Sequence, residues 1–366
     1  MSLELKNISM QVAGQTHIYE TNLTLKKGTM NVLLGRTLSG KTTLMRIMAG
    51  LDIPTTGKIF WNGKDVTGMR VQDRHIAMVY QQFINYPAMS VYDNIASPLR
   101  LMKKSRDEID SAVRETATLL HLTSELNKKP LELSGGQQQR CALARALVKG
   151  SGLVLLDEPL ANLDYKLREE LREEIPKIFE KSGAIFVYAT TEPEEALLLG
   201  GNVATLWEGR ITQFGESPFV YHFPNSATTA RVFSNPSMNF FNMKKEGKYI
   251  YFGDDEKELA SNSLLKLLDG EYLAGFRPNY LEIEKYTPQA IKIPVHLNVT
   301  EITGSETYLH ITHDSNYWIG LIEGVHNMDF NSDIDVYLDT RYIFVFSKDG
   351  VLVEPAFSSI DNYKES

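Results

Sequence analysis

Continuous apolar runs mark two segments of the chain as buried strands. Residues 30–34 and 153–156 are each apolar or nearly so and are bounded by turn residues. Runs of this length predict short strands buried on both faces, as in a parallel sheet. Residues 187–196 read as the end of another strand running into the start of a helix. Together these segments predict an α/β domain.

Other segments show spaced rather than continuous apolar positions. Within residues 138–148 the apolar positions recur at helical spacing and predict a helix: Cys141, Ala144, Leu147 and Val148. From about residue 240 apolar residues mark short alternating segments, which predict a small β domain: Phe252, Ile283, Ile291, Ile293, Val295, Leu297 and Val299. An α/β domain followed by an all-β domain is therefore expected.

Composition narrows the functional classes. The 366 residues allow two domains, and 43% hydrophobic with 23% charged residues is typical of a soluble globular protein. A net charge of −8 argues against a nucleic-acid binder with a broad basic surface. The single cysteine, Cys141, excludes an internal disulfide and is expected to pack as a small apolar residue. Since no apolar stretch reaches the roughly 20 residues of a membrane span, a membrane role would require a partner.

A glycine-rich loop follows the first predicted strand. Its pattern is G-x-x-x-x-G-K-[ST], and a helical stretch at residues 44–49 ends at Gly50. Glycines let backbone N–H groups face phosphates, and the new helix points its positive end at them. Lys41 would reach the β- and γ-phosphates of ATP, and the Thr42 hydroxyl would ligate Mg²⁺. The expected nucleotide-binding residues are Gly35, Arg36, Thr37, Leu38, Ser39, Gly40, Lys41, Thr42 and Thr43.

Two adjacent carboxylates follow the second predicted strand. Asp157 and Glu158 stand at its carboxyl end, where open α/β sheets place their ligands. Asp157 would hold Mg²⁺ and Glu158 would polarise the attacking water. Taken alone, such a pair could equally be solvated charges at a strand end. The neighbouring phosphate loop favours the catalytic interpretation.

A second anion-binding surface precedes the helix at residues 138–148. Ser134 is a good N-cap, and Gly135 and Gly136 expose N–H groups at a positive helix end, before Gln137. One ATP does not need two such surfaces from one subunit. We therefore expect a dimer that holds ATP between the phosphate loop of one chain and this helix end of the other.

The pentapeptide at residues 133–137 resembles the hallmark of the ABC ATPase family. By that resemblance residues 80–83 look like the Q-loop, in which Gln81, rather than Gln82, would contact Mg²⁺ and the water. The Q-loop would also couple the site to a helical subdomain at about residues 84–149. Residues 160–164 look like the D-loop, with Asp164 facing the partner subunit. The implied fold is a P-loop ABC ATPase with a RecA-like core and a helical subdomain.

The C-terminal third resembles the OB-like regulatory extension of carbohydrate-importer ATPases. The resemblance rests on residues 236–241, 275–278 and 299–307. It implies an ABC ATPase domain at residues 1–237 and a β-rich domain at residues 238–366. Residues 79–87 and 188–193 are most similar to the ATPase subunits of bacterial glycerol importers. The cargo is implied by resemblance alone, because an ATPase subunit does not normally touch it.

Two departures from the family pattern fall in this chain's own nucleotide pocket. Thr191 stands where the family carries a switch histidine that reaches the γ-phosphate. Residues 10–13 lack the aromatic ring that the family stacks on adenine, although His17 or Tyr19 could replace it. Either this site is impaired and pairs with a second, different ATPase subunit, or Thr191 is a tolerated variant with Glu158 sufficient.

The resemblance implies an ATP- and Mg²⁺-dependent motor of a bacterial importer. Its partners would be a second ATPase subunit, two transmembrane permease subunits and a substrate-binding protein, with no nucleic acid. The chain would lie at the cytoplasmic face of the plasma membrane. One alternative is a largely non-catalytic subunit that completes its neighbour's site. Another is a soluble ABC ATPase of translation or repair, although those usually carry two motor halves or a long coiled-coil insertion.

Overall fold

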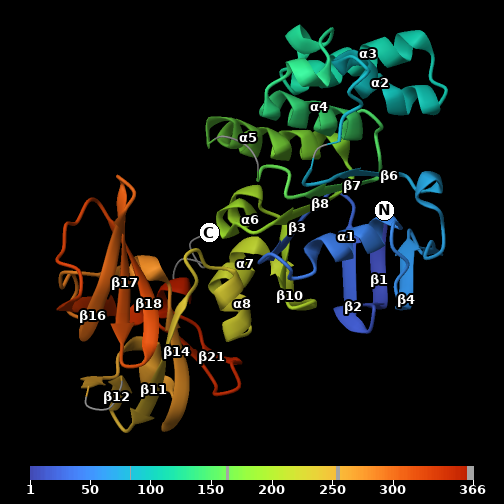
Figure 1. Ribbon diagram of the computed structural model, residues 1–366. Coiled ribbons are helices and arrows are strands. Elements are labelled where there is room, and N and C mark those ends of the chain that lie inside the picture. Colours follow the sequence, from blue (N-terminus) through green and yellow to red (C-terminus); the bar gives the residue numbers. More distant parts are fainter. Residues whose placement is uncertain (83, 162–164, 253–255, 361–366) are drawn as a thin grey trace. The chain divides into compact units, whose positions relative to one another are not determined.

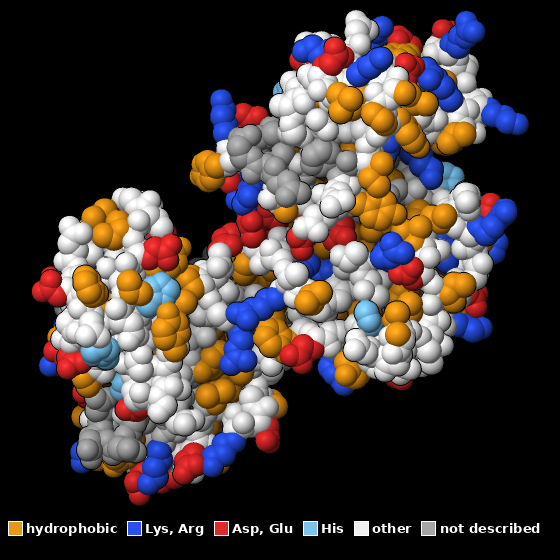
Figure 2. All heavy atoms as spheres, viewed as in Figure 1, with side chains coloured by type: hydrophobic (Ala, Val, Ile, Leu, Met, Phe, Trp, Pro, Cys, Tyr) orange, Lys and Arg blue, Asp and Glu red, His pale blue; other side chains and the backbone are white. Residues whose placement is uncertain are grey.

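The chain folds into two units, Met1–Ile211 and Thr212–Ser366. The computed structural model describes residues 1–82, 84–161, 165–252 and 256–360 (Figure 1). Acidic and basic side chains are interspersed over the face shown in Figure 2. No helix in these ranges is both long and apolar enough to cross a lipid bilayer.

A largely parallel sheet forms the centre of the first unit. Its strand order is β10-β9-β3-β8-β7-β6, and the pairs from β9 to β6 are parallel. Every residue of β3, β7 and β8 is buried, which confirms the strands predicted at residues 30–34 and 153–156. The strands are β3 (Met30–Gly35), β6 (Ile76–Val79), β7 (Leu153–Asp157), β8 (Ile185–Thr190), β9 (Asn202–Trp207) and β10 (Arg210–Glu216).

A second, antiparallel sheet shares the core of the first unit. Its order is β2-β1-β4-β5, with β1 (Ser2–Val12), β2 (Gln15–Lys26), β4 (Thr56–Trp61) and β5 (Lys64–Asp65). Apolar residues of β1 and β2 pack with helix α1 (Lys41–Ala49) against the parallel sheet. This packing fixes α1 at the carboxyl end of β3.

Three helices form the helical part of the first unit. They are α2 (Val91–Leu101), α3 (Arg106–Leu119) and α4 (Gly135–Leu147), and they lie together in Figure 1. Each begins at a serine N-cap whose side chain accepts a backbone N–H. Helices α5 (Tyr165–Ser182) and α6 (Pro193–Leu199) flank β8 in the sequence.

Two antiparallel sheets enclose the main core of the second unit. Their orders are β13-β12-β11-β14-β20-β21 and β15-β19-β16-β17-β18. Alternate residues of β11 and β17 are buried, as an OB-like β domain requires. The strands are β11 (Asn239–Glu246), β12 (Tyr249–Phe252), β13 (Glu256–Leu259), β14 (Gly270–Phe276), β15 (Leu281–Glu282), β16 (Ala290–Ile302), β17 (Glu306–His313), β18 (Asn316–Glu323), β19 (Ser332–Asp339), β20 (Phe344–Phe346) and β21 (Leu352–Glu354).

The apolar alternation of β16 changes face at Val299, which lies in a strand as predicted. Val299 is 49% exposed, whereas Leu297 in the same strand is fully buried. The register between β16 and β17 shifts between these two residues. A bulge of this kind inserts one residue and turns the following side chains to the other face.

The boundary between the units also differs from the predicted 237/238. Helices α7 (Ser217–His222) and α8 (Ala227–Val232) belong to the second unit. Ala227 and Ala230 of α8 pack with Phe344 and Phe346 of β20 in one buried cluster. The Ala227 amide also donates to the Gly350 carbonyl at 2.8 Å. These tertiary contacts, which no local pattern reports, place α8 with the second unit.

Candidate functional site

The phosphate loop connects β3 to α1 and depends on glycine at two points. A Cβ at Gly35 would lie 2.5 Å from Ser39 Oγ and 2.6 Å from the Leu206 carbonyl oxygen. Gly40, the N-cap of α1, has a φ of 104°, which L side chains rarely adopt. The Ser39 hydroxyl is buried and has no hydrogen-bond partner among the described residues. The loop therefore follows a tight path that leaves a polar group available for a ligand.

Lys41 is held at the centre of this loop. Its Nζ donates to the carbonyl oxygens of Gly35 at 2.7 Å and Arg36 at 3.1 Å. The same Nζ lies 3.2 Å from Glu158 Oε1, and the lysine side chain is only 4% exposed. Burial lowers the pKa of Lys41, and the Glu158 carboxylate partly opposes that change.

The two carboxylates after β7 lie in different surroundings. Asp157 is buried and accepts a hydrogen bond from the Thr42 side chain; burial raises the pKa of Asp157 and this bond opposes the change. Glu158 has a φ of 46° and turns its carboxylate toward Lys41, while its Oε2 accepts from Gln81 Nε2 at 2.9 Å. Five predicted site residues, from three strand ends, thus meet around one point.

The sheet order explains this convergence. Strands β3, β8, β7 and β6 are neighbours and parallel, so their carboxyl ends lie at one edge. The loop after β3, Gln81 after β6, Glu158 after β7 and Thr191 after β8 all leave the sheet there. Residues distant in sequence are therefore brought together by topology.

A hollow of about 560 Å³ opens above the phosphate loop. Residues 37–43, Gln81 and Glu158 line it, together with His17 and Tyr19 of β2. The Arg210 guanidinium lies 3.6 Å from the centroid of the Tyr19 ring. The structure thus places both alternative aromatic residues at the nucleotide pocket, although residues 10–13 offer no ring.

Thr191 and its neighbour Thr190 are placed differently. Thr190 is buried, whereas Thr191 is exposed at the loop after β8. Thr191 and Glu158 line the same small cavity of about 10 Å³. That volume is close to the minimum that holds one water molecule.

A buried glutamate anchors the loop that carries Thr191. Glu195 Oε2 accepts hydrogen bonds from Thr190 Oγ1 at 2.6 Å and from the Tyr188 hydroxyl at 3.1 Å. Arg172 of α5 bridges Glu195 at 3.3 Å and Glu192 at 2.5 Å. Burial raises the pKa of Glu195. The sequence does not predict this pair, because Arg172 and Glu195 lie on two different helices that meet only in the folded chain. The one local indication is that Glu195 follows Thr191 closely in the sequence.

The predicted second anion-binding surface is preorganised at the start of α4. The Ser134 side chain accepts from the Gln137 amide at 3.3 Å, and Gln137 Oε1 accepts from the Ser134 amide at 2.9 Å. This reciprocal capping box fixes the first turn and leaves Gly135 exposed. Cys141 packs on the buried face of the same helix, as predicted.

The segment after Gln81 is tied to α4. Asn85 Nδ2 donates to the Gln138 carbonyl at 2.8 Å, and Arg145 donates to the Ile84 carbonyl at 2.6 Å. The Arg145 guanidinium also lies 4.7 Å from the centroid of the Tyr86 ring. These contacts link the segment that follows Gln81 to α4, the helix capped by Ser134, a link that the sequence implies only by resemblance.

Comparison with known proteins gives concordant matches. The family model described as "ABC transporter" matches residues 18–161. The trehalose/maltose import ATP-binding protein MalK of Thermococcus litoralis is 36% identical over 91% of this chain and 94% of its own length. The chain belongs to the ABC transporter family. The oligosaccharides import ATP-binding protein MsmX of Bacillus subtilis is 35% identical over 84% of this chain and 87% of its own length. The sn-glycerol-3-phosphate import ATP-binding protein UgpC of Psychromonas ingrahamii is 31% identical over 95% of this chain and 94% of its own length.

Solved ABC cassettes share the fold of the ATPase part. A dimeric bacterial ABC transporter cassette matches with a TM-score of 0.54 and 27% identity, over 59% of this chain and 98% of that chain. A post-hydrolysis state of that cassette, bound to ADP and phosphate, matches with a TM-score of 0.53 and 28% identity. This ABC subunit is accordingly an ATP-binding protein whose family hydrolyses ATP to energise transport.

The fit of the ABC site to Mg²⁺ can be judged from its oxygens. The Thr42 hydroxyl and the Asp157 carboxylate are already within hydrogen-bonding contact, so two hard ligands converge beside the loop. No cluster of three or more His, Cys, Asp or Glu among the described residues could hold a metal ion. A Mg²⁺ that arrives with ATP keeps waters and phosphate oxygens and needs few protein ligands. Asp164 lies outside the described residues.

Proposed function

We propose that this chain is the ATP-hydrolysing subunit of an importer for a carbohydrate or a sugar alcohol. The observation that carries the hydrolytic part is the meeting of Lys41, Gln81 and Glu158 at one edge of the parallel sheet. The import part is supported by three relatives named for the import of trehalose/maltose, oligosaccharides and sn-glycerol 3-phosphate. Each of them matches most of this chain, including its second unit.

The proposed roles follow from the charges in the site. Lys41 would bind the β- and γ-phosphates, and the exposed N–H groups of the loop would bind the others. Glu158 would take a proton from the attacking water, which Gln81 would orient. Thr42, Asp157 and Gln81 are the residues that would hold Mg²⁺, which would neutralise phosphate charge when bound.

A dimer is needed to use both anion-binding surfaces. Ser134, Gly135, Gly136 and Gln137 would bind the ATP held by the phosphate loop of a second ATPase subunit, and Asp164 would face that subunit. We propose a non-identical partner, because the departures at Thr191 and at residues 10–13 affect this chain's own pocket only. The capping box that would serve the partner's ATP is complete.

A largely non-catalytic role is the second candidate, and Thr191 is the observation that favours it. A threonine hydroxyl is shorter than an imidazole and cannot become a cation. The one-water cavity between Thr191 and Glu158 supports the first candidate instead, since a bridging water there would extend the reach of the hydroxyl. The two candidate functions differ in whether the nucleotide site of this chain hydrolyses ATP.

The remaining partners are proposed from the same relatives. Two permease subunits would carry the cargo across the membrane, and a substrate-binding protein would deliver it. The chain would then lie at the cytoplasmic face, with the segment from Gln81 to about residue 95 toward the permeases. Glycerol is the proposed cargo, on the similarity of residues 79–87 and 188–193 to glycerol-importer ATPases.

The test is a cargo-stimulated ATPase assay of the purified complex in lipid vesicles. We expect stimulation by the binding protein loaded with a sugar alcohol, abolished by Glu158→Gln in this chain. Unchanged turnover in that variant would favour the non-catalytic candidate, and a several-fold gain from Thr191→His would favour an impaired native site. Calorimetry on the binding protein with glycerol, maltose and sn-glycerol 3-phosphate would identify the cargo.

A further inference from the structure

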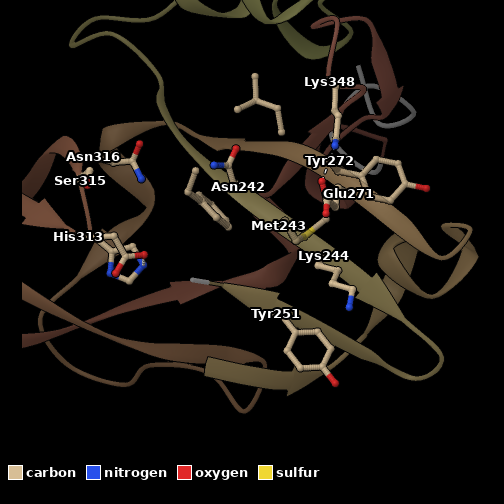
Figure 3. Close-up of a pocket in the computed structure, with 13 residues that line it drawn as sticks. Asn242, Met243, Lys244, Tyr251, Glu271, Tyr272, His313, Ser315, Asn316 and Lys348 are labelled. Carbon is tan, nitrogen blue, oxygen red and sulfur yellow. Dashed lines mark ion pairs between the residues drawn. The ribbon is translucent and has the colours of Figure 1, made fainter. Parts of the chain in front are cut away.

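The second unit contains a hollow formed entirely by its own residues. Its volume is about 730 Å³, and it is lined by residues of β11, β12 and β14, by His313 and Asn316 at the ends of β17 and β18, and by two loops (Figure 3). The loops are the turn between β17 and β18, which carries residues 314–315, and the turn between β20 and β21, which carries Lys348. The hollow is large enough for a ligand of the size of a disaccharide.

The floor of the hollow is the outer face of a sheet. Asn242 and Lys244 of β11 alternate with the buried Phe241 and Met243 and are exposed. Across the ladder, Lys244 stands opposite Glu271 of β14 and Tyr251 of β12. The floor therefore places the amide of Asn242 and the ring of Tyr251 close to the charged side chains of Lys244 and Glu271.

The rim of the hollow carries a buried histidine with an unsatisfied nitrogen. His313 is 4% exposed, and its Nδ1 lies 3.1 Å from the Pro294 carbonyl, which can only accept, so Nδ1 carries the hydrogen. Its Nε2 is buried with no hydrogen-bond partner among the described residues and lies 3.6 Å from Asp314 Oδ2. In neutral histidine these are two facing acceptors. A ligand hydroxyl could donate to either, because both residues line the hollow.

Further polar groups at the hollow have no hydrogen-bond partner in the described part of the chain. The side chains of Asn242, Ser315 and Asn316 make no hydrogen bond to any described residue. Amide side chains both donate and accept, as sugar hydroxyls do. Tyrosine rings give sugars an apolar platform, and Tyr251 and Tyr272 both line the hollow.

The charges of the hollow select a neutral ligand. Lys348 is paired with Glu271, and Lys244 lies 3.2 Å from Glu246 Oε2. The carboxylate of Asp314 faces His313. Lys244 and Lys348 are the lysines among the described residues that line the hollow, and each already has a carboxylate partner, so the lining favours a neutral ligand over a phosphate or carboxylate.

We propose that this hollow binds a neutral polyhydroxylated molecule, a sugar or a sugar alcohol, through Asn242, Asn316, His313 and the ring of Tyr251. The site is argued from the second unit alone; only the choice of probes rests on the proposed import function. A site of this kind would let the internal concentration of such a molecule act on the ATPase subunit.

The experiment is ligand-observed NMR and calorimetry on the full-length chain, with glycerol, maltose, trehalose and sn-glycerol 3-phosphate as probes. We expect at least one neutral probe to bind. Its affinity should fall about tenfold or more in the double variant Asn242→Ala/Asn316→Ala, the loss expected for two hydrogen bonds. Asn327→Ala, an exposed asparagine outside the hollow, is the matched control and should bind as the native chain does.

Three results would overturn the proposal: no binding by any neutral probe, equal affinity in the double variant, or binding of sn-glycerol 3-phosphate alone. Each of these results can be distinguished from failure of the proposed import function, because binding to the hollow is measured without transport. ATP hydrolysis by the double variant in the transport complex without added probe should equal that of the native chain, since the exchanged side chains belong to the other unit.

Discussion

At the scale of single residues, Glu158 has two simultaneous partners. Its carboxylate contacts Lys41 through one oxygen and Gln81 through the other. A base held in this way is oriented before any water reaches it, and its positive φ turns it out of the strand. Its position, rather than its residue type alone, makes it the expected base.

Replacement of Glu158 by glutamine should therefore remove hydrolysis and keep nucleotide binding. The amide cannot take a proton, so we expect ATP turnover by this site to fall by at least about 100-fold. Turnover is measured by phosphate release from the purified complex. Glu115→Gln, at an exposed position of α3, should leave turnover unchanged, and a similar loss there would point to a general effect.

Tyr19 is the residue we expect to stack on adenine. Tyr19→Ala should weaken ATP binding by roughly tenfold or more, since base–aromatic stacking is worth about 1–3 kcal/mol. Tyr19→Phe should retain native affinity, because the ring is kept. Fluorescent-nucleotide titration measures both, with Tyr249→Ala, a partly exposed tyrosine of the second unit, as control. Weakening by Tyr19→Phe equal to that by Tyr19→Ala would contradict stacking.

At the scale of elements, the junction between β8 and α6 depends on one buried carboxylate. Glu195 of α6 accepts from Tyr188 and Thr190 of β8 and pairs with Arg172 from α5. Three elements are thus joined at the loop that carries Thr191. The loop is held by contacts behind it and does not depend on the residue at position 191.

Glu195→Ala should accordingly destabilise the first unit. It leaves the buried hydroxyls of Tyr188 and Thr190 without their acceptor and removes one of the carboxylates that Arg172 contacts, which we expect to cost about 2–4 kcal/mol of unfolding free energy. Scanning calorimetry of the full chain measures this loss of stability. The unfolding transition of the first unit is identified as the one whose melting temperature rises when ATP is added. Glu173→Ala on the exposed face of α5 should shift that transition little. Equal shifts would show that Glu195 has no special role.

The reactivity of Cys141 reports how readily helix α4 opens to solvent. Burial raises the pKa of this thiol to about 11, and the side chain is fully buried. At pH 8 we expect its reaction with a disulfide reagent to be about 100-fold or more slower than in the urea-unfolded chain, because the thiolate is the reactive form. Stopped-flow absorbance follows the reaction. A native-state rate close to the unfolded rate would mean that α4 opens readily.

Local sequence patterns predicted the loops and strand ends that bear the candidate site residues, but they did not predict the tertiary contacts that hold these segments in place. The loop before Lys41 and the carboxylates after β7 follow strict spacing, so the sequence alone located them. Arg172 and Glu195 meet only after α5 and α6 pack, and no periodicity reports such a pair. The exposure of Val299 could not be read from the sequence for a related reason, since a bulge changes the register without changing the apolar alternation before it.

At the scale of the whole molecule, the two units have separate cores. The first core joins α1 to both sheets of the ATPase part, and the second lies between the two antiparallel sheets. Helix α8 contributes to a small third cluster with β20. A division of the chain must therefore keep α8 with the β strands.

Two fragments test this boundary. A fragment of residues 212–366 should fold, whereas residues 238–366 should melt more than about 5 °C lower, because removal of α8 uncovers Phe344 and Phe346. Circular dichroism gives the melting temperature, and a hydrophobic dye reports the exposed surface. Equal melting of the two fragments would restore the boundary to 237/238.

The contacts of Lys41 bear on how any nucleotide affinity is to be understood. An ammonium group donates three hydrogen bonds, and here the acceptors are two loop carbonyls and Glu158. Phosphate oxygens can reach this lysine only by replacing at least one of them. The dissociation constant of ATP is thus the outcome of an exchange reaction, in which the protein's own acceptors compete with the ligand. A chain that lacks the carboxylate at position 158 should, by that reasoning, hold ATP more tightly than the native chain.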